Sequence, residues 1–338
     1  DAVLALAREI ADQDLPIAAN CAARTVRADI EPIARVQQAT GLPLEVGAFI
    51  GSSPIRQYAE GWDVDRILDA TVDAIDFAVS EGLDVMYVTE DTTRSRPETL
   101  ERLYRAAIEA GARRICLADT VGHATPEGVR QLVRFARDLV AAAGEPVKID
   151  WHGHRDRGLG LANALAAIEE GVDRVHGTAL GIGERVGNVE MDLLLVNLHL
   201  FGAHDHPIDR LRDYCELTAE MCGLQVPHNY PVVGDDAFRT GTGVHAAAII
   251  KAFRKGDRWL EDCVYSGVPA SLVGCEQTIE ISPVSGLSNV RHWLGRHGYD
   301  AEDDALCEAV FGLAKRSDHT LTREEIEAEI GRFAQGPA

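Results

Sequence analysis

Two histidines with one residue between them, His152 and His154, carry the strongest chemical signal in the sequence. They follow the apolar run 147–151, which is typical of a buried β-strand. Residues two apart on a strand point to the same side, so both imidazoles can reach one ion. Two imidazoles completed by a carboxylate, an amide oxygen and water suit a divalent cation such as Zn, Mn, Mg or Co. The alternative is a pair of loop histidines satisfied by local hydrogen bonds, and the crowding of polar residues at neighbouring strand ends favours the metal site.

A glycine-rich segment, residues 181–188, contains the charged pair Glu184 and Arg185 and ends in Asn188. One interpretation is a rigid loop whose Asn188 amide reaches the metal. The other is a glycine-rich loop and helix start that close the barrel. The segment itself leaves both interpretations open.

Acidic residues follow two other predicted strands. Glu90 comes after the run 85–89, and Asp119 comes after the run 114–118. In a parallel barrel the residues that bind and react sit at the C-terminal ends of the strands. Each of the two carboxylates is therefore predicted either to contact substrate or to cap the helix that follows.

Other candidate residues lie beyond these strands. Considered alone, His245 opens an Ala-rich helical segment and is more typical of a structural histidine. Tyr265, also considered alone, is more typical of a packed aromatic. His204 and His206 repeat the two-residue spacing, but they lie in a linker just before Pro207 and are predicted to form a solvated turn.

A repeated unit positions the first set of residues: a short apolar run, a polar loop and a segment with helical periodicity. Strands alternating with helices predict parallel pairing. No GxGxxG follows the first strand, which favours a TIM (β/α)8 barrel over a dinucleotide-binding sheet. The predicted strands are 15–19, 44–50, 85–89, 114–118, 147–151 and 174–178, and the predicted helices are near 27–40, 64–81, 96–110, 125–143, 158–170 and 189–201.

Six such units are fewer than the eight of a closed barrel, which has roughly 250 residues. Residues 2–11 are typical of the helix of a preceding unit, and the chain starts at Asp1. We therefore expect an α/β barrel domain in residues 1–203 whose first strand, first helix and second strand are missing from this chain. Helical patterns without strand alternation predict a small helical linker region in residues 204–338, with helices near 208–222, 234–253, 256–264, 286–298, 302–316 and 322–334.

The composition excludes several classes of partner. Lys and Arg number 33 against 54 Asp and Glu, and the formal charge of −21 repels nucleic acid and anionic membranes. No apolar run reaches the roughly 18 residues of a membrane span. The seven cysteines are scattered without a CxxC pair, which predicts a reduced cytoplasmic protein with neither a structural zinc nor a disulfide framework.

Taken together, these motifs resemble the metal-dependent acyl-CoA Claisen condensation family. Its members include 2-isopropylmalate, homocitrate and citramalate synthases, with hydroxymethylglutaryl-CoA lyase as a relative. The resemblance covers the whole chain and is closest to 2-isopropylmalate-synthase-like proteins without the regulatory domain. The most specific segments are 152–159 with 162–163 and 176–188, supported by 119–122, 243–245, 265–274 and 285–289.

The resemblance implies a role for each candidate residue. His152 and His154 would be metal ligands, with Asn188 in or near the coordination sphere, and the metal would chelate an α-keto acid. A base removes a proton from the acetyl-CoA methyl group, the enolate attacks the keto carbon, and water then cleaves the thioester. The remaining implied roles are catalysis for His245, Tyr265 and Glu184, and substrate binding for Glu90, Thr178 and Arg155.

The resemblance also implies a homodimer whose linker regions cross over, because His245 and Tyr265 would reach the barrel mouth of a partner subunit. A synthase is favoured over a lyase because the segment 179–188 lacks the cysteine of the lyases. One alternative is a homocitrate or citramalate synthase-type activity on another keto acid. The other is a non-catalytic paralogue that keeps the barrel as a binding module.

The sequence departs from the family pattern in four places. The family's first strand ends in an Arg-Asp pair that supplies a metal ligand and a cation; this chain begins after that strand, and the start at Asp1 favours omission of the segment. Arg155 stands where Asn is usual and is expected to tune substrate choice or weaken metal affinity. Residues 240–242 replace the usual His-Glu-Ser, which affects acetyl-CoA contacts. No regulatory domain follows, so feedback inhibition through one is not expected.

Overall fold

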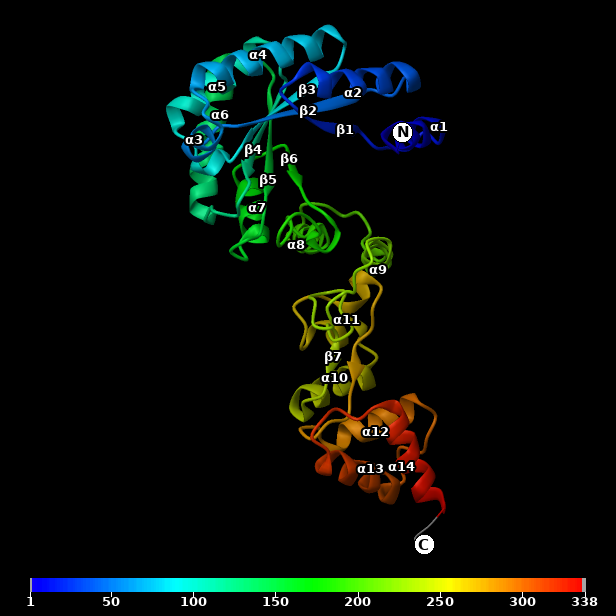
Figure 1. Ribbon diagram of the computed structural model, residues 1–338. Coiled ribbons are helices and arrows are strands. Elements are labelled where there is room, and N and C mark those ends of the chain that lie inside the picture. Colours follow the sequence, from blue (N-terminus) through cyan, green and yellow to red (C-terminus); the bar gives the residue numbers. More distant parts are fainter. Residues whose placement is uncertain (1, 336–338) are drawn as a thin grey trace. The chain divides into compact units, whose positions relative to one another are not determined.

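A computed structural model describes residues 2–335, and its contacts divide the chain into two units between Leu194 and Leu195. The first unit contains the strand–helix repeats, and the second contains the C-terminal helices (Figure 1). The division lies inside helix α8 (Met191–Leu200), whereas the sequence-based boundary at residue 203 follows this helix. Asp1, on which the expectation of an omitted segment partly rests, lies outside the described residues.

The first unit is built on a curled sheet of six parallel strands in the order β1 to β6, which is an α/β half-barrel. Each strand pairs with its neighbours in chain order, and this confirms the α/β barrel-type fold predicted from the strand–helix alternation. The strands are β1 (Ala19–Arg24), β2 (Leu44–Gly51), β3 (Asp84–Glu90), β4 (Arg114–Asp119), β5 (Lys148–Gly153) and β6 (Arg174–His176).

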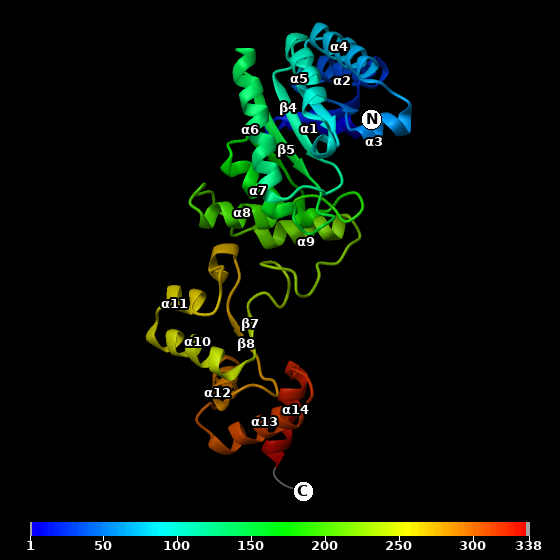
Figure 2. The same cartoon turned by 90° about the vertical axis from the view of Figure 1, so that its left-hand side faces the viewer.

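Helices lie along the outside of this curl (Figure 2). Their first turns are fixed by side chains of the preceding loops: Ser53, Asp63 and Thr125 each accept a hydrogen bond from a backbone N–H of the following helix. The helices of this unit are α1 (Ala2–Asp12), α2 (Arg27–Thr40), α3 (Pro54–Glu60), α4 (Val64–Ser80), α5 (Pro97–Glu109), α6 (Pro126–Ala143), α7 (Gly160–Glu169) and α8, with short 3₁₀ turns η1 (Thr92–Arg94) and η2 (Ala179–Gly181).

The first strand lies further along the chain than predicted. The apolar run 15–19 leads into a strand that begins at Ala19, so β1 overlaps the predicted strand at that residue alone. The register of β1 on β2 runs from the pair Ala19 and Leu44 onward. Pro16 has no N–H to donate to a ladder, which disfavours pairing of the apolar run itself.

The second unit is mainly helical, as the sequence predicts. Its helices are α9 (Leu211–Met221), α10 (Gly243–Lys255), α11 (Arg258–Cys263), α12 (Leu287–Arg296), α13 (Asp304–Arg316) and α14 (Arg323–Gln335), with the 3₁₀ turn η3 (Ala270–Val273). The segment 234–242 is not helical, in contrast to the prediction. Instead β7 (Arg239–Thr240) pairs in parallel with β8 (Thr278–Ile279), which the sequence pattern did not indicate. No helix in residues 2–335 is long and apolar enough to cross a membrane.

Candidate metal and active site

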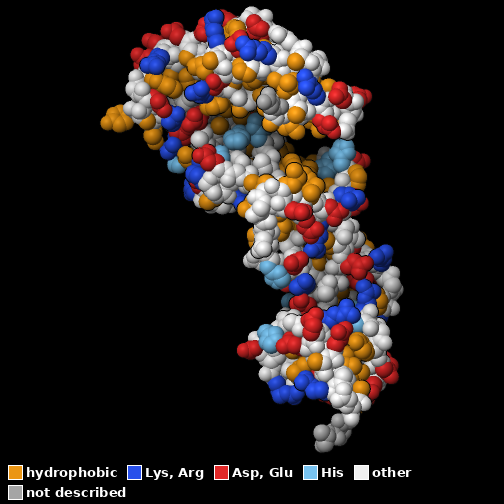
Figure 3. All heavy atoms as spheres, turned by 45° about the vertical axis from the view of Figure 1, so that its right-hand side comes forward, with side chains coloured by type: hydrophobic (Ala, Val, Ile, Leu, Met, Phe, Trp, Pro, Cys, Tyr) orange, Lys and Arg blue, Asp and Glu red, His pale blue; other side chains and the backbone are white. Residues whose placement is uncertain are grey.

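The predicted metal-binding histidines lie where β5 ends, on the inner side of the curled sheet. His152 is half-buried and His154 is 7% exposed. Their ring centroids are 5.3 Å apart. In the first unit, histidine side chains gather in the hollow visible in Figure 3. The two-residue spacing therefore brings the imidazoles together, as the strand geometry requires.

Asn188 adds a third potential metal ligand to the two histidines. It forms an isolated antiparallel bridge with His154, and its Nδ2 donates to the Ile182 carbonyl at 3.3 Å. Its Oδ1 atom is buried and has no hydrogen-bond partner among the described residues. A buried amide oxygen without a donor is costly unless a ligand satisfies it.

The glycines of the segment 181–188 allow this close packing. A Cβ atom at Gly183 would overlap the Asn188 amide. Gly187 has a φ of +104°, and a Cβ there would overlap the Gly181 carbonyl oxygen. Glycine is required at both positions, because only a residue without a Cβ permits these approaches. The segment is thus shaped around Asn188.

The donor set fits a divalent metal. Two imidazole nitrogens and one amide oxygen are ligands that Zn, Mn and Co accept, and the orphaned Asn188 oxygen supplies the observation that points to an ion. No group of three or more His, Cys, Asp or Glu side chains in the described part of the chain has the arrangement of a metal site. The candidate ligands are two histidines and one asparagine, so they are not a group of that kind.

The environment of His152 keeps its ring neutral. Burial lowers the pKa of His152 to about 4, with the neighbouring His176 and His154 adding to the effect. A neutral imidazole has the lone pair that a metal requires, and it does not have to lose a proton first. His152 Nδ1 lies 3.3 Å from Nδ1 of His176, the residue opposite it on β6.

Behind these histidines lies a buried ionic cluster that the sequence analysis missed. Asp150 is fully buried and pairs with Arg114 at 2.5 Å, with Arg174 at 2.6 Å and with Nε2 of His176 at 3.0 Å. Glu45 joins both arginines, at 3.0 Å and 2.6 Å. Burial raises the pKa of Asp150, but the hydrogen bonds from His176, Arg114 and Arg174 outweigh burial and hold the pKa below its usual value.

A sequence signal for this cluster exists. Asp150 stands two residues before His152, and Arg174 stands two residues before His176, so each pair shares one face of its strand. Charged residues at alternate positions of strands otherwise buried on both faces indicate an inward polar layer. The pairing across strands, however, depends on the register of β5 with β6, which the sequence does not provide.

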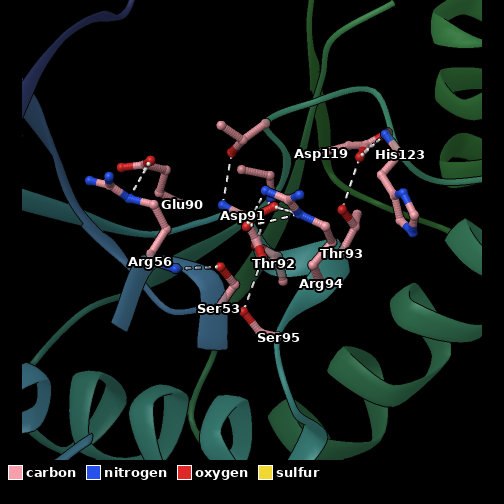
Figure 4. A network of polar contacts seen from close by, with 12 residues as sticks. Ser53, Arg56, Glu90, Asp91, Thr92, Thr93, Arg94, Ser95, Asp119 and His123 are labelled. Atoms are coloured by element: carbon pink, nitrogen blue, oxygen red, sulfur yellow. Dashed lines mark hydrogen bonds and ion pairs between the residues drawn. The ribbon is translucent and has the colours of Figure 1, made fainter. Parts of the chain in front are cut away.

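A second polar network lies at the ends of β3 and β4 (Figure 4). Glu90 is partly buried and lies 3.2 Å from the Arg56 Nε atom. Asp91, buried and with a φ of +61°, forms an ion pair with Arg94 at 2.8 Å. Asp119 is fully buried and accepts hydrogen bonds from Thr93, from the His123 N–H and from the Ala124 N–H. These contacts hold the loop between β4 and α6, and the N-cap of α6 is Thr125, so Asp119 does not cap that helix.

Three other predicted residues lie in or beside the segment 181–188. Thr178 is half-buried and donates to the Ile182 carbonyl at 2.6 Å. Arg155 donates to the Val186 carbonyl at 2.6 Å and to the Glu190 carboxylate at 2.5 Å, so its guanidinium is held by this segment. The Glu184 side chain is 80% exposed and pairs weakly with Arg185 at 3.7 Å.

The predicted catalytic pair of the linker region lies in the second unit. His245 is in the first turn of α10, and Tyr265 follows α11. Their rings stack with centroids 4.2 Å apart and an interplanar angle of 26°. Both side chains are exposed. The structure therefore brings together two residues that are separated in sequence and that each look structural when considered alone.

Comparison with known proteins places the chain in a family. The family model named HMGL-like matches residues 1–218. The chain belongs to this family. This agrees with the resemblance that the motifs carry.

The sequence relatives carry synthase names. A homocitrate synthase of Pyrococcus horikoshii is 31% identical over 271 residues, which is 80% of this chain and 70% of that protein. A 2-isopropylmalate synthase of Halothermothrix orenii is 29% identical over 94% of this chain and 61% of that protein. A protein of Methanopyrus kandleri, provisionally named (R)-citramalate synthase, is 31% identical over 95% of this chain. The chain spans 61% of the length of this last relative.

Solved structures agree on the fold. A Bacillus subtilis HMG-CoA lyase has a TM-score of 0.55 at 19% identity, and covers 67% of this chain and 77% of the lyase chain. An hydroxymethylglutaryl-CoA lyase from Pseudomonas aeruginosa has a TM-score of 0.53 at 19% identity, over 62% of this chain and 72% of that chain. At this identity the likeness concerns the fold alone.

Proposed function

We propose that this protein is an acyltransferase that condenses acetyl-CoA with an α-keto acid and then hydrolyses the thioester, releasing CoA. The observation that carries the proposal is the buried Oδ1 of Asn188, which lacks a hydrogen-bond partner within residues 2–335 and lies on the residue bridged to His154. The synthase names of three relatives support the same reaction class. Within this class, a 2-isopropylmalate-synthase-like activity is the leading choice, and homocitrate or citramalate synthase-type activity is the alternative.

His152, His154 and Asn188 would hold the divalent metal, which when bound supplies Lewis-acid polarisation of the keto group. The chain's own residues prepare this site. His152 is kept neutral by burial. The segment 181–188 fixes the Asn188 amide from one side, and Arg155 fixes that segment through Val186 and Glu190. These contacts preorganise the donors before any ligand binds.

Glu90 and Thr178, at the ends of β3 and β6, are the proposed contacts of the keto acid. Glu184 is proposed to assist catalysis from the exposed loop beside them. His245 and Tyr265 are proposed to move protons during deprotonation of the acetyl group and protonation of the new hydroxyl group. Their exposed, stacked rings are available to the barrel mouth of a partner subunit, which supports a homodimer with crossed linker regions.

A reducing, cytoplasmic location is part of the proposal. All seven cysteines are free. Buried Cys116 is inert, because burial raises the pKa of its thiol well above the usual value. Such thiols are typical of proteins that fold where disulfides do not persist.

The test is a release assay for CoA with the full-length protein. Acetyl-CoA is supplied with Mn²⁺ and, in separate reactions, with 2-oxoisovalerate, pyruvate or 2-oxoglutarate, and the hydroxy-acid product is identified by mass spectrometry. Keto-acid-dependent CoA release with formation of the matching product supports the proposal and names the substrate. Metal binding without CoA release on any keto acid would contradict it and favour a binding module.

A further inference from the structure

Three side chains in a row connect the buried ionic cluster to His152. The Asp150 carboxylate lies 3.0 Å from Nε2 of His176, and Nδ1 of His176 lies 3.3 Å from Nδ1 of His152. The register of the sheet creates this row, because His176 stands opposite His152 and Arg174 stands opposite Asp150. None of the roles implied by the family resemblance uses Asp150 or His176.

The hydrogen bonds of this row have one consistent direction. An ionised carboxylate only accepts, so His176 Nε2 must donate to Asp150. A neutral imidazole has one N–H, and Nδ1 of His176 is therefore an acceptor. The Nδ1 atom of His152 must then carry its hydrogen and donate to His176. This arrangement leaves Nε2 of His152 with a free lone pair.

The ionic cluster holds in place the Asp150 carboxylate that accepts from His176. Arg114 and Arg174 carry two positive charges, and Asp150 with Glu45 carries two negative charges. Asp150 is also held on several sides, so its carboxylate has a fixed orientation toward His176.

A different contact determines which ring nitrogen of His154 carries the hydrogen. Its Nδ1 lies 3.2 Å from the Gly187 carbonyl oxygen, which can only accept. Nδ1 of His154 therefore carries the hydrogen, and Nε2 is free. Both predicted ligands therefore present Nε2 to a metal. The Gly187 carbonyl sets the tautomer of His154, and the side chains of His176 and Asp150 set that of His152.

We infer that Asp150 and His176 are positioning residues that fix the tautomer and ring orientation of His152, so that its Nε2 atom is available to a divalent metal. This inference rests on the metal site of the proposed function. Outer partners of metal-binding histidines commonly orient the ring and raise its basicity, and losing one costs 10- to 100-fold in metal affinity. The unusual element here is a second histidine inserted between the carboxylate and the ligand.

The experiment measures Co²⁺ binding to the full-length protein without any turnover. His176→Leu removes both hydrogen bonds, whereas in His176→Gln the side-chain amide can donate to Asp150 and accept from His152. The control is His123→Leu, which removes an exposed histidine that follows β4. Affinity is measured by competition with a chromophoric chelator, and the visible spectrum of bound Co²⁺ reports the ligand geometry.

We expect His176→Leu to weaken Co²⁺ binding roughly 10- to 100-fold and to alter the Co²⁺ spectrum, with His176→Gln and His123→Leu close to wild type. Equal affinity and spectrum in wild type and His176→Leu would overturn the inference but leave the metal site intact. Absence of Co²⁺ binding in the wild type would instead overturn the metal site of the proposed function. If His176→Leu does not fold, as judged by circular dichroism, His176→Phe replaces it, because phenylalanine keeps a ring at this position but makes neither hydrogen bond. Unchanged Co²⁺ affinity and spectrum in that variant would also overturn the inference.

Discussion

Asn188 and His154 face each other across an isolated bridge, and the Asn188 Oδ1 atom has no hydrogen-bond partner within the described chain. Two glycines before Asn188 leave no room for larger residues: a Cβ at Gly183 would overlap the Asn188 amide, and one at Gly187 would overlap the Gly181 carbonyl oxygen. The loop is therefore shaped to hold an unsatisfied oxygen at the end of β5. Such an arrangement costs stability unless a ligand completes it, and this is the reason for placing Asn188 in the proposed metal site.

The first prediction concerns the oxygen of Asn188. Asn188→Ala removes it and should lower metal affinity at least tenfold, since even the loss of an outer partner commonly costs this much. Asn188→Asp keeps an oxygen at the same position and should retain metal. Metal content after dialysis, measured by inductively coupled plasma mass spectrometry, distinguishes the variants. Equal metal content in Asn188→Ala and wild type would exclude Asn188 as a ligand.

The second prediction concerns the two histidines of β5. Replacement of both His152 and His154 by Ala should abolish bound metal and turnover, because two of the three donors are lost. Removal of metal from the wild type by a chelator should abolish turnover, and added Mn²⁺ or Co²⁺ should restore it. The readouts are metal content and CoA release.

The chain supplies a matched control for this experiment. His204 and His206 have the same spacing, but His204 Nε2 donates to the Leu195 carbonyl oxygen and His206 is exposed. The double alanine variant of this second pair should keep metal and activity. Loss of metal in both double variants would indicate a general effect of removing histidines and not a site at β5.

Much of the first unit could be predicted from local pattern. The strands β2 to β5 lie within a few residues of their predicted positions, because apolar runs and helix-terminating glycines are local signals. The start of β1 was not predictable in this way, since its ladder with β2 begins only at the last residue of the apolar run, Ala19. The ladder of β7 and β8 was missed for the same reason, because two-residue strands are defined only by their partners.

In the candidate site, too, only features that depend on neighbouring residues in the sequence could be predicted. The pairing of His152 with His154 was predicted from their spacing, whereas the metal-binding role of Asn188 was implied by the family resemblance. The pairing of Glu45 with Arg174 joins residues 129 positions apart, and neither has a local signal of its partner. Only strand order and register bring Glu45, Arg114 and Asp150 into one layer, so the positioning role of His176 became visible only in the structure.

The third prediction concerns Arg155, which stands where the family usually has Asn. In this structure Arg155 holds the segment 181–188 through the Val186 carbonyl and through Glu190, which is 15% exposed. Arg155→Asn should loosen this segment by about 1–3 kcal/mol, because charge-assisted hydrogen bonds are lost and Glu190 is left unpaired. Amide hydrogen exchange of the segment should then be roughly 5- to 150-fold faster.

A surface arginine provides the comparison for this prediction. Arg105 pairs with Glu101 on the exposed face of α5, and such pairs contribute about 0–1 kcal/mol. Arg105→Asn should leave exchange of the segment 181–188 unchanged. Unaltered exchange in Arg155→Asn would contradict a clamping role and return Arg155 to the substrate-binding role implied by the resemblance.

The fourth prediction concerns the stacked pair His245 and Tyr265. His245→Ala should lower kcat about 10²- to 10⁴-fold, the range typical of a lost acid–base group, while metal content stays at the wild-type level. The two readouts, kcat and metal content, separate this variant from the double alanine variant of the β5 histidines, which is expected to lose both bound metal and turnover. Reduced metal content in His245→Ala would contradict the division of roles between the two units.

The same variants test whether the pair acts on a partner subunit. His245→Ala and the double alanine variant at His152 and His154 are each expected to be inactive as separate proteins. If the linker regions cross over, a hybrid dimer contains one site with intact histidines from both subunits, so co-expression with two different tags should recover CoA release in the doubly purified fraction. If each subunit uses its own His245, the hybrid has no complete site and stays inactive. Recovery therefore requires a dimer with shared sites, and its absence in a verified hybrid would contradict the crossed arrangement.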